Sequence, residues 1–258
     1  MFTETEINYY QYMNHQLPSE PPVYRYRNPL VPLMYDHNFI YFERMPEVSF
    51  FQDVHADEKN RNLKDGMGHT RYYFPVGEEA GQLFKNFLSE NEFTQDRMLY
   101  YKVDQEAVSK WLSRGDNTTL EVTNERLLDK YLSINKAYDL QISERFADQK
   151  QILNKAIYQL PKIKQYLAFC GGKPAGSGEL FIDDENRIAK AENLFISESF
   201  QNRGVARQLL KTMFIDNKEE ISSMYAVTYE EDTAKHFYEK LGFTFVYSQH
   251  TALQIIKK

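Results

Sequence analysis

The chain has 258 residues, of which 42% are apolar and 26% are charged, and its formal net charge is −6. These values exclude an intrinsically disordered chain, and no stretch approaches the roughly 20 consecutive apolar residues that a membrane-spanning helix needs. The acidic balance argues against a protein that coats nucleic-acid phosphates, and it favours cationic or amine-bearing partners.

The N-terminal half is predicted to consist of extended segments separated by proline-rich and polar stretches. Its first residues are acidic and lack the basic and apolar regions of a signal peptide, and the single cysteine, Cys170, excludes an intramolecular disulfide. We therefore expect a cytoplasmic protein. Five of the nine prolines lie within residues 18–32, which predicts a loop or an edge segment, and the polar composition of residues 53–69 predicts another loop.

Four elements are predicted before residue 113. They are strands at residues 38–42, 69–74 and 98–103, and a helix from residue 78 to about residue 90 whose apolar face is Leu83, Phe84, Phe87 and Leu88. The short polar cluster at residues 113–117 indicates a boundary. We therefore expect an N-terminal domain over residues 1–115 and a second domain over residues 116–258.

Sharper patterns follow in the C-terminal half. Alternating runs separated by turn residues predict an antiparallel meander, and Ser143 is a favourable N-cap for a helix that follows it. This order of elements predicts an α+β fold with a mixed sheet. The expected strands are 118–123, 165–170, 175–182, 188–196, 224–228 and 243–247, and the expected helices are 125–138, 144–158, 204–217 and 234–241.

One motif carries a chemical prediction, namely Q-x-x-G-x-A between the strand at 188–196 and the helix that follows. Backbone N–H groups at a helix N-terminus favour an anion, and Gly204 lets the backbone approach a phosphate closely. Arg203 and Arg207 add positive charge, so a pyrophosphate suits the segment, although an ordinary strand-to-helix loop is the alternative. The residues concerned are Gln201, Asn202, Arg203, Gly204, Val205, Ala206 and Arg207.

Residues 194–210 resemble the strand, loop and helix that bind coenzyme A in the GNAT superfamily of acyl-CoA-dependent N-acyltransferases. Residues 234–243 carry a second segment similar to that family, A-x-x-F-Y-E-K-L-G-F, in the expected order. The resemblance covers residues 118 to 256. It implies a GNAT mixed sheet flanked by helices in the C-terminal half. The N-terminal half is separately expected to be a smaller α/β domain.

The resemblance also implies how acetyl-CoA is held and attacked. The pantetheine arm would lie along Leu194, Phe195 and Ile196 as an added strand does, and the amides of that strand would bind the acetyl carbonyl. Tyr238 matches the family's tyrosine, which would act as the acid toward the leaving sulfur. The alternative for Tyr238 is a core tyrosine at the end of a helix.

Glu192 is the candidate base. It lies two residues before Leu194, so in a regular strand the two side chains share a face. Carboxylates of that strand serve as bases in parts of the family, whereas the plainer interpretation is a solvent-facing glutamate. Glu231 stands where the family often has Asn, and it and Glu230 are further carboxylate candidates.

The resulting functional hypothesis is transfer of an acetyl group from acetyl-CoA to a primary amine of a small molecule or a peptide, without a metal, a nucleic acid or a membrane. The alternative is a non-catalytic protein that binds or senses acyl-CoA. The run Asp53-x-His55-x-Asp57 could offer metal ligands on a strand, but its polar surroundings predict a solvated loop.

The N-terminal half contains a weak internal echo. Residues 85–94 match residues 235–244 in register at one Lys, two Phe and one Thr. We therefore expect residues 1 to about 115 to form a degenerate GNAT-like copy, with an unrelated α/β cap as the alternative. Leu88 stands in this copy where Tyr238 stands in the other, so the N-terminal half is expected to be inactive.

Overall fold

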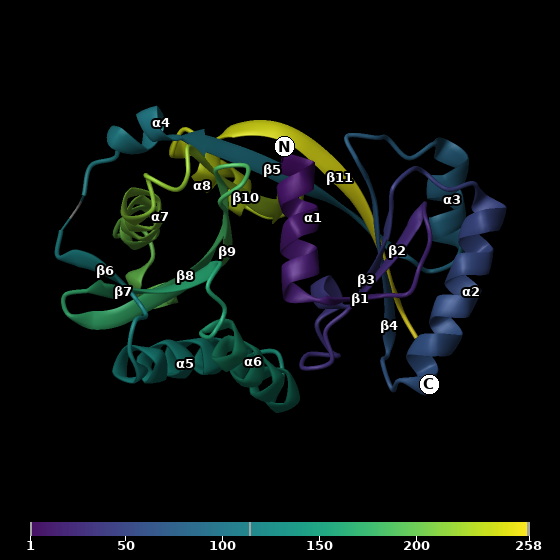
Figure 1. Ribbon diagram of the computed structural model, residues 1–258, viewed down its shortest axis with the longest axis horizontal. Helices are drawn as coiled ribbons and strands as arrows, with labels where there is room; N and C mark the ends of the chain where they lie inside the picture. Colours follow the sequence, from purple (N-terminus) through teal and green to yellow (C-terminus); the bar gives the residue numbers. More distant parts are fainter. Residues whose placement is uncertain (1, 114, 257–258) are drawn as a thin grey trace. The chain divides into compact units, whose positions relative to one another are not determined.

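The structure is a computed structural model that describes residues 2–113 and 115–256, and Figure 1 shows its helices and strands. The helices are α1 (Phe2–Met13), α2 (Val48–Lys64), α3 (Gln82–Glu90), α4 (Gln105–Ser109), α5 (Glu125–Asp139), α6 (Glu144–Ile157), α7 (Val205–Asp216) and α8 (Ala234–Lys240), with two 3₁₀ turns, η1 (Tyr35–His37) and η2 (Glu198–Phe200). The strands are β1 (His15–Leu17), β2 (Val23–Arg27), β3 (Phe39–Phe42), β4 (His69–Val76), β5 (Thr94–Asp104), β6 (Asn117–Glu121), β7 (Ile163–Cys170), β8 (Lys173–Asp183), β9 (Ile188–Ile196), β10 (Ser223–Tyr229) and β11 (Thr244–Ile255).

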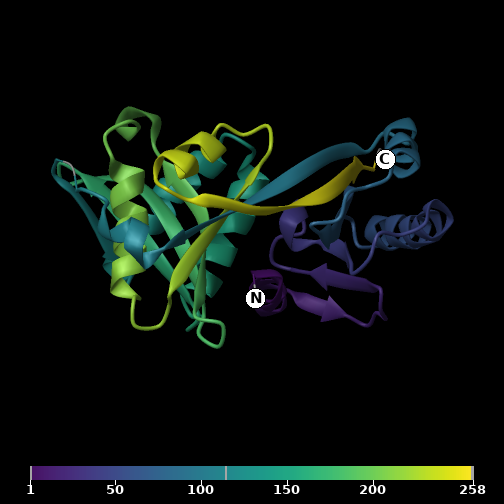
Figure 2. The same cartoon turned by 90° about the horizontal axis from the view of Figure 1, so that it is seen from above.

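The chain forms two compact units that alternate along the sequence. Unit 1 consists mainly of Tyr100–Val227 and Thr233–Phe245, and unit 2 consists mainly of Glu6–Leu99, Thr228–Asp232 and the segment from Val246 onward. The neighbouring strands β5 and β11, which run side by side in Figures 1 and 2, are each divided between the units. The compact units are therefore discontinuous in sequence, and the division into residues 1–115 and 116–258 stays a prediction.

Unit 1 is built on the strand order β5-β10-β9-β8-β7-β6. Strands β7 to β9 form the predicted antiparallel meander, and β6 pairs antiparallel with β7. Strands β9 and β10 are parallel and are connected through α7. Helices α5 and α6 cover one face of this sheet, and α7 lies on the other face (Figure 1). The predicted cap is present, because Ser143 Oγ accepts a hydrogen bond of 3.1 Å from the backbone N–H of Phe146. The α+β mixed-sheet prediction is confirmed.

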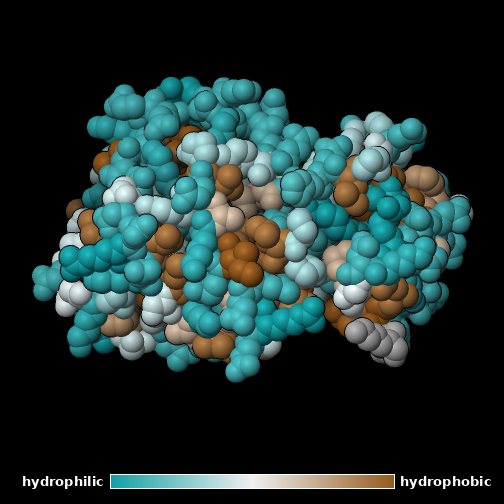
Figure 3. Space-filling view, turned by 60° about the horizontal axis from the view of Figure 1, so that its bottom comes forward, coloured by the Kyte–Doolittle hydropathy of each residue, from teal (hydrophilic) through white to brown (hydrophobic). Residues whose placement is uncertain are grey.

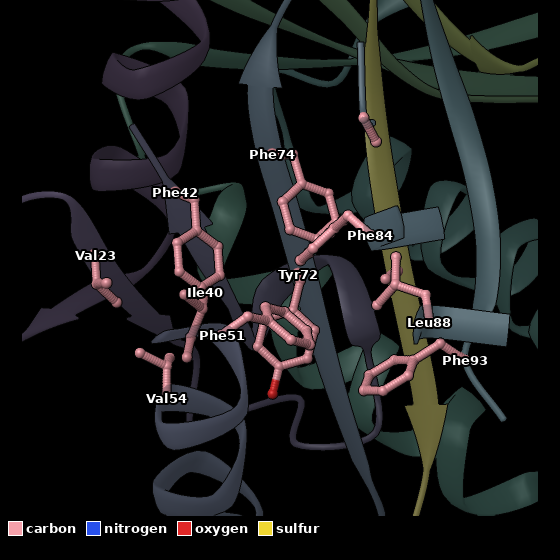
Figure 4. Close-up of a cluster of buried hydrophobic side chains, with 12 residues drawn as sticks. Val23, Ile40, Phe42, Phe51, Val54, Tyr72, Phe74, Phe84, Leu88 and Phe93 are labelled. Atoms are coloured by element: carbon pink, nitrogen blue, oxygen red, sulfur yellow. The ribbon is translucent and has the colours of Figure 1, made fainter. Parts of the chain in front are cut away.

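Unit 2 has the strand order β1-β2-β3-β4-β11, with β3 and β4 parallel and connected through α2. Its core is aromatic: the ring of Phe51 on α2 lies between the rings that β3, β4 and α3 contribute (Figure 4). Phe51 meets Tyr72 at 4.9 Å and Phe84 at 5.2 Å between ring centroids, both edge to face. Such offset and edge-on ring contacts are favourable beyond the apolar area that they bury.

The prediction of a loop at residues 53–69 is wrong, because α2 runs through most of it. The buried stripe of α2 has helical spacing, but two of its four members, Glu58 and Asn62, are polar. Glu58 is paired with Arg25 and Arg27, so a buried ion pair replaces the apolar residues that the periodicity criterion needs. The polar composition of this segment therefore led to the wrong prediction of a loop where a packed helix is present.

Three smaller predictions also need correction. Helix α1 was not expected in the N-terminal half. Leu83 does not lie on the buried face of α3, because 82% of its surface is exposed. Strand β11 continues to Ile255, well beyond the expected end at residue 247. Each of these depends on packing partners that a local pattern does not specify.

Among the described residues, none of the helices combines the length and the apolar composition that crossing a membrane requires. In the surface view of Figure 3, apolar side chains are interspersed among hydrophilic ones.

Candidate functional site

The central feature of unit 1 is the C-terminal part of β9. The parallel pairing of β9 with β10 runs from Ile188 opposite Ser223 to Ala191 opposite Ala226, whereas β9 itself continues to Ile196. Residues 192–196 are all partly exposed, although they belong to a strand in the middle of a sheet. A strand edge that leaves its neighbour exposes backbone N–H and C=O groups to an extended ligand, which could then bind as an added strand does.

Strand β9 contains a β-bulge at this point. Ser177 of β8 pairs with Phe195, and Glu179 pairs with Glu192, so one residue separates the pair on β8 and two residues separate it on β9. Asn193 is in the left-handed region, with φ of 50°. Such a bulge bends a strand and changes the direction of the side chains that follow it.

The bulge overturns one prediction about the site. Glu192 and Leu194 do not share a face: Glu192 lies on the same face as Phe195, because their partners on β8 are two residues apart. Leu194 points to the α7 side, since a methyl group built on Gly178 would lie 2.8 Å from Leu194 Cδ2 and 2.7 Å from Met213 Cε. Glu192 instead faces the helices α5 and α6.

The loop after β9 has the geometry that its motif predicts. Gly204 is the N-cap of α7 with φ of 81°, a left-handed conformation that glycine adopts without strain. Asn202 is also left-handed, with φ of 60°. Side chains hold the loop at both ends, because Gln201 Nε2 donates to Ile196 O (3.2 Å) and Asn117 Nδ2 donates to Arg203 O (2.8 Å).

This loop leads directly into the first turn of a twelve-residue helix. The first N–H groups of a helix have no partner within the helix, and Gly204 has no side chain that could cap them. The helix dipole and the nearby Arg203 and Arg207 favour a negative group at this point. The arrangement of Gln201 to Arg207 therefore suits a phosphate or pyrophosphate.

Tyr238 lies on α8, and only 6% of its surface is exposed. Its ring packs against Phe243 at 5.2 Å and against Tyr101 at 6.2 Å between centroids. The residue is thus part of the aromatic core of unit 1. This placement is compatible both with a core tyrosine and with a hydroxyl presented at the end of the helix.

Glu192 is not an isolated carboxylate. Its Oε1 lies 2.6 Å from Lys190 Nζ, and the Lys190 side chain is almost completely buried. A proton accepted by Glu192 would therefore cost this ion pair. The sequence motifs did not single out Lys190.

Glu230 and Glu231, the further carboxylate candidates, belong to unit 2. Glu231 is exposed, and Glu230 Oε1 lies 3.6 Å from Arg97 Nη1.

The run Asp53-x-His55-x-Asp57 lies on α2 and not on a strand or a loop. His55 Nδ1 is 2.8 Å from the Tyr72 hydroxyl, and Asp57 is paired with Arg25. Burial, and secondarily Lys59, lower the pKa of His55 to about 4. In the described part of the chain, no three His, Cys, Asp or Glu side chains are grouped as a metal site requires.

This mixed sheet, whose parallel strands part beside a glycine-capped helix, agrees with the fold that the resemblance to the GNAT superfamily implies. Residues 162–245 match the family model described as an acetyltransferase (GNAT) domain, so this chain carries a GNAT domain. It is 29% identical over 239 residues to the protein named uncharacterized N-acetyltransferase CgeE of Bacillus subtilis (strain 168), with 88% of this chain and 87% of that protein covered.

Solved structures resemble the chain over nearly its whole length. One is a conserved protein of unknown function from Staphylococcus epidermidis, with a TM-score of 0.83, 18% identity and 95% of each chain covered. Another is a tandem GNAT protein from the clavulanic acid biosynthesis pathway, with a TM-score of 0.56, 8% identity, and 99% of this chain and 96% of that chain covered. At these identities, the likeness concerns the fold.

Proposed function

We propose that this protein is an N-acetyltransferase that transfers an acetyl group from acetyl-CoA to a primary amine. The observation that carries the proposal is the exposed edge of β9 beyond Ala191, followed within a few residues by the glycine-capped start of α7. The first feature suits an extended amide-containing arm, and the second suits a pyrophosphate. Coenzyme A carries both groups on one molecule.

The residues that would hold acetyl-CoA follow from this geometry. Leu194, Phe195 and Ile196 would bind the pantetheine arm through their backbone. The loop from Gln201 to Ala206 and the guanidinium of Arg207 would bind the pyrophosphate. When bound, acetyl-CoA supplies a thioester as the acyl donor, and the backbone N–H groups of β9 are the donors available to its carbonyl oxygen.

Two side chains are proposed for the proton transfers. Tyr238 would donate a hydrogen bond or a proton to the departing thiolate, as its place in the second motif suggests. Glu192 would accept a proton from the substrate ammonium, directly or through water, so that the neutral amine can attack the thioester. Protonation would neutralise Glu192 and end its charge pairing with Lys190. If Glu192 is the base, Glu192→Gln should displace the pH–rate profile, and a profile that does not move would exclude this role.

A non-catalytic acyl-CoA-binding protein is the second candidate. Two observations favour it, namely the ion pair that already occupies Glu192 and the 6% exposure of Tyr238. This candidate shares the cofactor site with the first one. It differs only in the absence of turnover.

Release of free thiol on mixing the protein with acetyl-CoA and a panel of amines separates the two candidates. The panel should contain amino acids, polyamines, amino sugars and peptides. Amine-dependent thiol release supports the enzyme. Calorimetric binding of CoA without any release supports the sensor, and the absence of binding would overturn both.

The N-terminal half is proposed to be a degenerate copy of the C-terminal half. The order β3-α2-β4-α3-β5 repeats as β9-α7-β10-α8-β11, and in each run the first two strands are parallel. The preceding strands also agree, because β2 is antiparallel to β3 as β8 is to β9. We propose that residues 116–258 alone carry the catalytic activity.

A further inference from the structure

A buried carboxylate in unit 1 is bonded to the residue that forms the bulge of β9. Glu179 of β8 is 2% exposed, and its Oε2 accepts a hydrogen bond of 2.6 Å from Asn193 Nδ2. Neither residue belongs to the motifs that identify the cofactor site. Their position, directly before the exposed edge at Leu194 to Ile196, is what connects them to it.

The side chain of Asn193 is held at both ends. Its Nδ2 donates to Glu179, and its Oδ1 faces Lys150 Nζ at 3.4 Å, from the neighbouring helix α6. The opposite orientation of the amide would place its oxygen against a carboxylate and its NH₂ group against an ammonium. The two contacts therefore allow one orientation of the side chain, and they fix it on a backbone that is left-handed.

Glu179 is itself fixed from two further directions. Its Oε1 accepts a hydrogen bond of 2.7 Å from the Tyr131 hydroxyl and a longer one of 3.4 Å from Gln165 Nε2. Burial, with the negative charge of Glu179 as the next cause, raises the pKa of Tyr131 far above its ordinary value, so the hydroxyl stays a donor. A buried carboxylate with three donors is costly to disturb, because each donor would lose its acceptor.

The bulge determines to which face of the sheet the following side chains of β9 point. With the bulge present, Leu194 faces α7 and Phe195 faces α5, where its ring lies 4.3 Å from that of Tyr138. Without it, the strict alternation of a strand would exchange these two faces. The peptide groups between them would turn with the side chains.

We propose that Glu179 is a positioning residue for the acetyl-transfer step, acting through Asn193 on the backbone of Leu194 to Ile196. This inference rests on the proposed function, since it concerns the edge of β9 that would bind the thioester arm. Glu179 touches none of the reacting atoms. Its contribution is to hold the bulge in the one register that presents those backbone donors.

The test compares Glu179→Gln, Asn193→Gly and the double variant in the full-length chain. Glycine tolerates the left-handed backbone but lacks the amide that contacts Glu179 and Lys150. Asn193→Gly therefore tests the side-chain contacts alone. We expect each single variant to lower kcat about tenfold or more, with KM for acetyl-CoA and calorimetric CoA affinity changed less than about threefold. Because both variants break the same contact, their effects on kcat should not multiply in the double variant.

Ser177→Ala is the matched control. Ser177 is buried on the same face of β8, and its Oγ donates to Asn135 Oδ1 at 3.1 Å, so the variant also loses one buried hydrogen bond. It has no bond to Asn193, and we expect kcat to be retained even if the melting temperature falls.

The outcomes separate the two levels of the proposal. No CoA binding or no turnover in the unmodified protein would overturn the proposed function, and the inference with it. Turnover with unchanged kcat in both single variants, or a change confined to KM, would overturn the positioning role alone. Multiplying effects in the double variant would also contradict it, since the two residues would then act separately.

Discussion

The runs β3-α2-β4-α3-β5 and β9-α7-β10-α8-β11 have the same order and the same parallel first pair, yet they differ where the crossover helix begins. Helix α7 begins after Gly204, whose φ is 81°. Helix α2 begins after Glu47, with φ of −64° and no side-chain cap bond. Both helices form and pack, so the fold does not require the glycine. A left-handed glycine at the start of α7 is what the proposed phosphate site needs, because it lets the backbone approach the ligand closely.

The charge at the N-terminus also differs between α2 and α7. Glu47 places a carboxylate at the N-terminus of α2, where the helix dipole already favours one negative group. A phosphate approaching that end would meet like charge. At α7 the same position is occupied by a residue without a side chain, flanked by Arg203 and Arg207. The two runs thus share an order of elements and differ in the charge at the start of the helix that connects their parallel strands.

The two runs also differ at the helix that follows the second strand, where α3 has Leu88 and α8 has Tyr238. We expect the largest effect on kcat from a substitution of Tyr238. Tyr238→Phe keeps the ring in its buried position and removes only the hydroxyl. We expect kcat to fall about 10²–10⁴-fold with little change in CoA affinity, because in the proposed mechanism the hydroxyl acts on the leaving sulfur. Steady-state kinetics and calorimetry on the same preparation measure the two quantities.

Tyr101→Phe provides the control for this prediction. Tyr101 packs on Tyr238, and its hydroxyl donates to Glu239 Oε1 at 3.0 Å. Its loss should leave kcat within about threefold. Full activity in Tyr238→Phe would instead return Tyr238 to the role that Leu88 has, a buried residue of the helix.

The next effect concerns the phosphate loop. Gly204→Glu gives α7 the kind of N-cap residue that α2 has, and it forces a side chain into a left-handed backbone. We expect CoA affinity to fall tenfold or more, because one charge-assisted bond to phosphate contributes about 1.5–3 kcal/mol. Glu47→Gly makes the reverse exchange at α2 and should leave CoA affinity unchanged. If Gly204→Glu bound CoA with the same affinity as the unmodified protein, the assignment of this loop to the cofactor would be wrong.

The same comparison shows what the sequence could predict. Helix α7 was predicted because its buried residues, among them Leu209 and Met213, are apolar at helical spacing. Its counterpart α2 was not, because Glu58 and Asn62 lie on its buried stripe and are both bonded to Arg27, which is distant in sequence. Local patterns report burial only where burial is apolar.

The site shows the same limit. The glycine turn was predictable, since a short-range conformational preference decides it. The bulge at Asn193 was not, and with it the faces of Glu192 and Leu194, because a register shift is a property of two paired strands. Likewise, no local signal marks Lys190 or Glu179, whose roles arise from partners brought together by the fold.

We expect the stability of unit 2 to depend more strongly on acid pH than that of unit 1. His69 in unit 2 is 2% exposed, and burial lowers its pKa to about 4. The unfolded chain, with an ordinary histidine pKa of about 6.5, then binds the proton more tightly than the folded one. Stability of unit 2 should therefore be fully present above about pH 6.5 and decline as the pH falls toward 4, by up to about 3 kcal/mol from this residue.

Hydrogen exchange measured at pH 7, 6, 5 and 4, after correction for the intrinsic exchange rate, tests this difference. Peptides of unit 2 should lose protection on acidification before those of the β7–β9 meander. His69→Phe should reduce the pH dependence of unit 2 without abolishing it, because His55 in the same unit also has a pKa of about 4. His236→Gln, at an exposed histidine of unit 1, should leave that dependence unchanged. A simultaneous loss of protection in both units, unaffected by His69→Phe, would contradict the assignment.

The smallest effects are expected from two buried asparagines, one in each unit, and they should have opposite signs. Asn154 on α6 is 1% exposed, and neither its Oδ1 nor its Nδ2 has a hydrogen-bond partner in the described part of the chain. Asn62 on α2 is 0% exposed, but its Nδ2 donates to His69 O and its Oδ1 accepts from Arg27 Nη2, both at 2.6 Å. Leucine has a similar size and no polar atoms. Asn154→Leu removes two unsatisfied groups and should leave the free energy of unfolding unchanged or raise it by about 1–2 kcal/mol. Asn62→Leu removes one acceptor of the Arg27 guanidinium, which keeps its bond to Glu58, and the side-chain donor of the His69 carbonyl, and it should lower the free energy of unfolding by about 2–4 kcal/mol. Urea denaturation of both variants measures the difference, and a loss of equal size in both would show that Asn154 has a partner, such as a buried water, that the side-chain contacts do not include.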